Sequence, residues 1–123
     1  MIHVPRKVHR SPDDRKISLH FWQTARGAEP VRDWLRSLST EDRRIVGMDV
    51  LRLQYRWPVG MPLCRPMGDG IWEVRSDLGD GRTSRVLFCF AQSRLVALHA
   101  FIKKSRSTPA TDLRLARTRM KDL

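Results

Sequence analysis

Three consecutive segments of alternating residues, separated by very short turns, constrain the fold of this chain more than any other feature. Residues 71–78, 82–90 and 94–102 are rich in β-branched and aromatic residues and alternate in polarity, which is the pattern of strands. Gly79-Asp80-Gly81 separates the first two segments, and Ala91-Gln92-Ser93 separates the last two. Since connections this short join antiparallel neighbours, we expect a three-stranded antiparallel meander.

The segments before the meander predict one strand and a helical hairpin. Residues 16–22 alternate apolar and polar side chains, as in a half-buried strand. Pro30 then opens a segment with apolar residues at helical spacing. Ser39 and Asp42 resemble the capping box of a second helix, which Pro58 ends. Residues 58–70 are rich in Pro and Gly and predict a loop.

After the meander, Thr108 and Pro109 are expected to be the N-cap and first residue of a C-terminal helix. One face of this helix is apolar: Leu113, Ala116, Met120 and Leu123. The predicted fold class is therefore α+β: an N-terminal strand, a helical hairpin, a three-stranded antiparallel meander and a C-terminal helix. Residues 16–123 are long enough for a single domain, and residues 1–15 are expected to form a flexible basic arm.

The charge of the chain indicates an anionic partner. The sequence holds 24 Lys and Arg against 13 Asp and Glu, a net charge of +11. Between Arg65 and Lys121 there are twelve basic and five acidic residues, so 12 − 5 = +7 of this excess lies there. Phosphate neutralisation makes nucleic acid the leading candidate partner. Two alternative partners are an anionic membrane and an acidic protein. A further alternative is that the basic surface only keeps the protein soluble.

The alternation of side chains along strands assigns the meander residues to two faces. The even-numbered positions are mainly apolar and are expected to form a core beneath the helical hairpin: Trp72, Val74, Val86, Phe88, Phe90, Val96, Leu98 and Ile102. The odd-numbered positions mix polar and apolar residues, among them Glu73, Arg75, Arg85, His99, Phe101 and Lys103. Such a mixed face is typical of a partly covered binding site.

Turns of three residues would place Arg75 opposite Arg85, and Arg85 opposite His99. Because like charges directly opposite one another destabilise a sheet, a row of three such side chains suggests a bound anion. A register slip of two residues would keep these side chains on the same face and would break the row.

The residue types on this face suit a phosphodiester. Arginine donates two parallel hydrogen bonds to phosphate, and Lys103, crowded by Lys104 and Arg106, is a candidate proton acceptor. Phe101 offers a ring on which a base can stack. Each of these side chains has a plainer interpretation, as a solvated cation or as a cap on the core. Their convergence on one face favours a site.

No metal site is expected, because the four histidines and two cysteines lack ligand spacing. Cys64 and Cys89 are flanked by apolar residues, which predicts buried free thiols in a reducing cytoplasm. No apolar run approaches the roughly 18 residues of a membrane span, so no membrane-spanning segment is expected, and nucleic acid is preferred over a membrane as the partner. No cofactor is expected either.

From about Glu29 to Met120, the sequence resembles the Gp49-like branch of the HigB toxins, within the RelE/ParE superfamily. The matching motifs are Pro30-Val31-Arg32-Asp33-Trp34-Leu35, Ile71-Trp72-Glu73-Val74-Arg75, Arg85-Val86-Leu87-Phe88, and His99-Ala100-Phe101-Ile102-Lys103-Lys104 followed by Thr108-Pro109. The resemblance implies a RelE-like fold and a toxin that cleaves mRNA, usually on the translating ribosome. It also implies a cognate antitoxin, often with a helix-turn-helix domain, through which the complex binds operator DNA.

The resemblance further implies that the 2′-hydroxyl of the RNA attacks the adjacent phosphate. By position, the catalytic residues would be Arg75, Arg85 and Lys103 or Lys104. From the residues themselves, without the resemblance, we also expect a set of side chains to bind RNA: Glu73, His99, Phe101, Arg106, Arg114 and Arg117. The sequence departs from the best-known ribonucleases of the superfamily because it lacks a tyrosine near its C-terminus. Two rival functions stay open: a toxin that poisons DNA gyrase, and a non-catalytic nucleic-acid-binding module.

Overall fold

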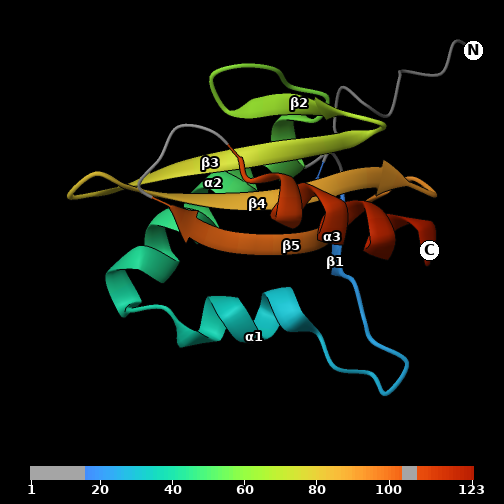
Figure 1. Ribbon diagram of the computed structural model, residues 1–123. Helices are drawn as coiled ribbons and strands as arrows, with labels where there is room; N and C mark the ends of the chain where they lie inside the picture. Colours follow the sequence, from blue (N-terminus) through green and yellow to red (C-terminus); the bar gives the residue numbers. More distant parts are fainter. Residues whose placement is uncertain (1–15, 104–107) are drawn as a thin grey trace, which may run out of the picture.

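The computed structural model describes residues 16–103 and 108–123 and shows a mixed α+β fold around a five-stranded sheet (Figure 1). The strand order is β1-β5-β4-β3-β2, with β1 parallel to β5 and the other neighbours antiparallel. The strands are β1 (Leu19–Phe21), β2 (Cys64–Gly68), β3 (Ile71–Gly79), β4 (Arg82–Ala91) and β5 (Arg94–Lys103). The helices of the described ranges are α1 (Pro30–Ser37), α2 (Thr40–Arg56) and α3 (Ala110–Lys121). The arm expected at residues 1–15 lies outside the described residues.

The helical hairpin forms where the sequence predicts it. Pro30 is the first residue of α1, and the side chain of Ser39 caps α2 by accepting a hydrogen bond of 3.1 Å from the backbone N–H of Asp42. Helix α2 ends at Arg56, before Pro58. No helix in the described ranges is long and apolar enough to cross a lipid bilayer.

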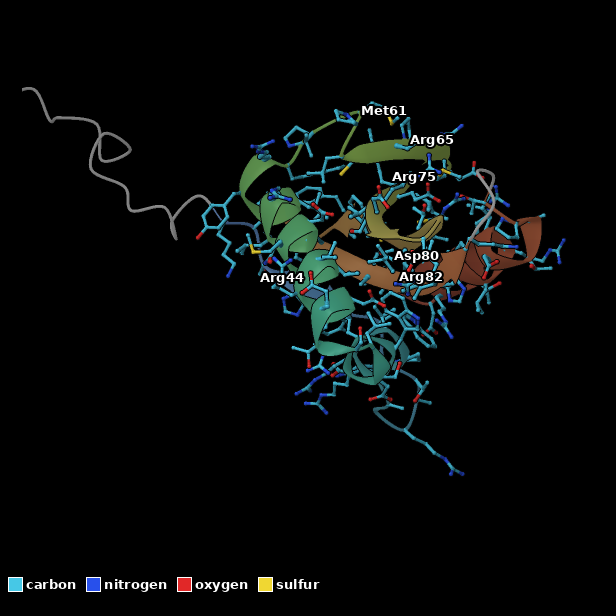
Figure 2. All side chains as sticks on the ribbon, turned by 90° about the vertical axis from the view of Figure 1, so that its left-hand side faces the viewer. Arg44, Met61, Arg65, Arg75, Asp80 and Arg82 are labelled. Carbon is cyan, nitrogen blue, oxygen red and sulfur yellow. The ribbon has the colours of Figure 1, made fainter. Side chains whose placement is uncertain are left out.

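Both faces of the sheet are covered, so the protein has two hydrophobic cores. Helices α1 and α2 pack on one face through residues such as Val31, Val46 and Leu53, and α3 packs on the other through Ala116. Figure 2 shows the sheet between these two layers. Of the residues expected on the apolar face of α3, Leu113, Ala116 and Met120 pack on the sheet, whereas Leu123 is exposed.

The three-stranded meander is confirmed as β3, β4 and β5, but the prediction of a loop over residues 58–70 is wrong at residues 64–68. These residues form β2, an edge strand in which Cys64 pairs with Val74 and is fully buried. This strand was not predicted because Pro66 and Gly68 are residues that normally disfavour strands. Proline is tolerated there because an edge strand leaves one row of backbone groups without a ladder partner.

Two irregularities in β4 and β5 change the predicted register. Ala91 pairs with Arg94, so the turn between β4 and β5 has two residues, not the three that were predicted. These residues, Gln92 and Ser93, both have positive φ. A bulge then inserts Leu98 between the partners of Phe88 and Leu87. Each change shifts the register by one residue, so the shift totals two beyond the bulge.

The bulge also corrects the face assignment. Val96 and Leu98 lie under α3, not under the hairpin as predicted, whereas Leu95 and Ala97 lie under the hairpin. Beyond the bulge the predicted faces hold, with Ala100 and Ile102 in the hairpin core and Phe101 on the α3 side. Phe90 was expected in the core, but it is 44% exposed. Its ring packs beside the ring of Trp57.

An ion pair ties the start of α2 to the start of β4 and makes stability depend on pH. Arg82 donates hydrogen bonds of 2.8 and 3.2 Å to the two carboxylate oxygens of Asp42. These bonds hold the pKa of Asp42 below its ordinary value. Since the folded protein then binds fewer protons at low pH than the unfolded chain, the pair stabilises the fold above about pH 4.

We therefore expect the difference in unfolding free energy between wild type and Arg82→Gln to be constant above about pH 5. It should shrink as the pH falls through the lowered pKa of Asp42. Urea unfolding from acid to neutral pH measures it. The exposed pair of Arg44 with Glu41 gives a control in Arg44→Gln, for which a smaller difference is expected. A difference for Arg82→Gln that is as large at pH 3 as at pH 7 would contradict this assignment.

Candidate functional site

Four cationic side chains from four neighbouring strands lie on the face of the sheet that carries α3. Arg75 pairs with Arg85, Arg65 pairs with Glu73, and Lys103 pairs with Thr83, so the alternation of side chains places all of them on one side. Figure 2 labels Arg65 and Arg75 on adjacent strands. We call Arg65, Arg75, Arg85 and Lys103 the cationic face. Arg65 escaped the sequence prediction because β2 was taken for a loop.

The predicted row across the strands is right in two of its three members. Arg75 lies opposite Arg85 as expected, but Arg85 lies opposite Phe101, not opposite His99. The two-residue turn and the bulge in β5 together produce this displacement. His99 pairs with Leu87 and stays on the same face.

Arg85 is fully buried and takes part in a charged hydrogen-bond network. Its guanidinium donates to the hydroxyl of Thr108 at 3.2 Å, and that hydroxyl donates to Oε2 of Glu73, which is also fully buried. The other carboxylate oxygen of Glu73 lies 3.5 Å from Nε of Arg75. Thr108 was predicted to cap α3, but Pro109 is the N-cap residue and no side chain caps the helix. Thr108 instead links the start of α3 to β3 and β4.

Most of the environment of Arg85 disfavours its positive charge, whereas the carboxylate of Glu73 favours it. Burial lowers the pKa of Arg85, the nearby charges of Arg75 and Arg65 lower it further, and the carboxylate of Glu73 raises it. Arginine nevertheless keeps its charge at neutral pH. The side chain of Arg85 has no exposed surface, so its charge lies beneath the cationic face and does not reach the solvent.

The other members of the cationic face reach the solvent. Arg65 is exposed, Lys103 is partly exposed, and the side chain of Arg75 is 25% exposed while Glu73 orients it from below. An anion on this face would therefore meet Arg65, Arg75 and Lys103 first, with Arg85 contributing charge from beneath.

His99 and Phe101 continue the face along β5. Their rings stack with centroids 5.5 Å apart, and Nε2 of His99 lies 2.6 Å from a carboxylate oxygen of Asp112 in the first turn of α3. The side chain of His99 is 17% exposed. Asp112 was not singled out from the sequence, since an acidic residue in a first helical turn is ordinary.

The remaining predicted site residues are more dispersed. Arg114 is exposed on α3, and Arg117 donates to Asp69 in the turn between β2 and β3 at 3.1 Å. Lys104 and Arg106 lie outside the described residues. Neither Arg114 nor Arg117 joins the network of Glu73, Arg85 and Thr108.

Cys64 and Cys89 are free and buried, as predicted. Burial raises the pKa of the Cys64 thiol to about 12 and also raises that of Cys89, so neither is a reactive thiolate. In the part of the chain that the structure describes, no group of three or more His, Cys, Asp or Glu residues could hold a metal ion.

One protein family matches this chain. The model of a family described as phage derived protein Gp49-like covers residues 33–121, from within α1 to the end of α3. This range includes every residue of the cationic face and the network around Glu73. No curated protein matches the chain.

Proposed function

The chain belongs to the Gp49-like family of phage-derived proteins, a RelE/HigB-like family associated with toxin–antitoxin systems, and from this premise we propose that it is a toxin that cleaves mRNA. The observation that carries the proposal is the cationic face, where Arg65, Arg75 and Lys103 surround the buried charge of Arg85. A phosphodiester needs such a surface, because its charge grows as the transition state forms.

In the proposed reaction the 2′-hydroxyl of the substrate attacks the adjacent phosphorus and loses its proton to a general base. The bond from phosphorus to the 5′-oxygen breaks, and that oxygen takes up a proton. The products are a 2′,3′-cyclic phosphate and a 5′-hydroxyl, and in this proposal cationic side chains stabilise the phosphate. The protein contributes positioning and electrostatic stabilisation.

We assign roles by exposure and charge. Arg75 donates hydrogen bonds to the phosphate, and Glu73 holds Arg75 in place. Arg85 supplies positive charge from beneath the face. Lys103 is the proposed general base, with Lys104 as its neighbour in sequence, and Phe101 stacks on a base. His99, Arg106, Arg114 and Arg117 are proposed to bind the RNA further along the strand.

The proposal includes the partners of a type II toxin. A cognate antitoxin, of the helix-turn-helix kind, would bind and block the toxin and carry the complex to operator DNA. The substrate would be mRNA on the ribosome, in the cytoplasm.

Primer extension on ribosome-bound mRNA tests the activity. We expect cuts with wild type and with Arg44→Gln, which removes an exposed arginine of α2 on the opposite layer. Absence of cuts together with inhibition of DNA gyrase would assign the protein to the gyrase-targeting toxins. RNA binding without cuts would make it a binding module, and either result would overturn the proposal.

A further inference from the structure

A cleft of about 210 Å³ lies between α1 and α3 beside β5. Pro30, Val31 and Trp34 of α1, His99 and Ala100 of β5, and Arg119 of α3 line it. It lies beyond the last residue of β5 that pairs with β1, since that pairing covers only Leu95 to Ala97. Figure 1 shows α1 and α3 on either side of this part of β5.

Arg119 is a partly buried cation without an acidic partner in the described part of the chain. Its guanidinium donates to the backbone oxygen of Leu98 at 2.8 Å and lies 4.7 Å from the centre of the Trp22 ring. Asp122, the nearest acidic residue in the sequence, accepts its hydrogen bond from the indole of Trp22 instead. Burial alone lowers the pKa of Arg119, with no carboxylate opposing it. A desolvated guanidinium with unused donors is suited to an anion.

The cleft offers aromatic surface together with this cation. The ring of Trp34 and the imidazole of His99 both line it, and Asp112 fixes the orientation of His99. A flat aromatic ligand with an attached anion fits such a lining, because rings stack on rings and guanidinium binds phosphate. A nucleotide has both parts.

The cleft continues the cationic face. His99 stacks on Phe101, which lies two residues further along β5, about 7 Å away, and Phe101 pairs with Arg85. A single strand of RNA that crosses the cationic face can therefore follow β5 into the cleft.

We propose that this cleft is a second RNA subsite, in which Arg119 binds a phosphate and Trp34 and His99 contact the base of a nucleotide next to the cleaved bond. This inference rests on the proposed function. It adds a binding site between α1 and α3 and makes the protein's affinity depend on RNA length.

Fluorescence anisotropy with labelled, 2′-O-methylated RNA, which lacks the attacking hydroxyl, tests the subsite. We expect Arg119→Gln to weaken binding of an RNA of about eight nucleotides by about tenfold and to reduce the slope of log affinity against log salt by about 0.7. Binding of a trinucleotide that reaches only the cationic face should not change. Arg44→Gln, which removes the same charge from α2, should change neither quantity.

A second measurement uses the unaltered protein, in case Arg119→Gln fails to fold. The indole N–H resonance of Trp34, assigned through Trp34→Phe among the four tryptophans, should shift with the longer RNA and not with the trinucleotide. Equal responses to both RNAs, or equal affinities for Arg119→Gln and Arg44→Gln, would overturn the subsite and leave the proposed function standing. Failure of wild type to bind either RNA would also overturn the subsite, whereas absence of cuts in ribosome-bound mRNA would overturn the proposed function and the subsite together.

Discussion

Replacing Arg75 with glutamine is expected to reduce mRNA cleavage by about 100- to 1,000-fold, the usual cost of removing one donor from a charge-stabilising site. Arg75 is the partly exposed arginine of the predicted row, and Glu73 orients it from the buried side. Glutamine keeps a hydrogen-bond donor on a shorter side chain and loses the charge and the planar fork. Single-turnover cleavage of ribosome-bound mRNA measures the loss, and RNA affinity should fall far less than the rate.

Two comparisons decide whether the loss is chemical. Arg75→Lys keeps the charge without the fork and should recover part of the rate, while Arg44→Gln should cleave as wild type does. A thermal melt of each variant shows whether it is folded. Cleavage by folded Arg75→Gln within threefold of the wild-type rate would remove Arg75 from the proposed mechanism.

The elements of this fold are predictable where local sequence alone determines them. Pro30 and Ser39 mark the starts of two helices, and the alternating segments on either side of Gly79-Asp80-Gly81 mark two strands. Strand β2 was missed because Pro66 and Gly68 interrupt its pattern, although it pairs with β3 across the short turn at Asp69 and Gly70. Local pattern carries little information about such an edge strand.

The site was predictable in its faces and not in its details. Alternation placed Arg75, Arg85, Phe101 and Lys103 on one side correctly, because the two register shifts add to an even number. The two-residue turn and the bulge at Leu98 together exchanged the row partner of Arg85 from His99 to Phe101, and no local pattern signals the bulge. Burial of Arg85 could not be predicted either, because its hydrogen-bond network joins residues that are far apart in the sequence. Arg85 and Thr108 are 23 residues apart, and Thr108 and Glu73 are 35 residues apart.

That burial changes what substitution of Arg85 can show. An exposed catalytic arginine could be removed with little effect on folding, and cleavage would then be lost while binding was kept. Arg85 instead is buried and opposes the negative charge of the buried Glu73 carboxylate. Loss of cleavage in Arg85→Ala would therefore combine a catalytic effect with an effect on stability. Stability must therefore be measured first.

We expect Arg85→Leu to lower the free energy of unfolding by about 3–5 kcal/mol, because it removes a positive charge that opposes the buried carboxylate of Glu73. The carboxylate would keep the guanidinium of Arg75 at 3.5 Å and the hydroxyl of Thr108 as partners. Glu73→Gln combined with Arg85→Leu removes both charges and should recover most of this loss, since two buried opposite charges contribute little net stability over uncharged neighbours. Urea unfolding of the two single variants and the double variant measures the coupling. A double variant that loses the sum of the two single effects would show that Glu73 and Arg85 do not stabilise each other. If the folded double variant also cleaves mRNA at least tenfold more slowly than folded Glu73→Gln alone, Arg85 acts on the phosphate through its charge as well as through the fold.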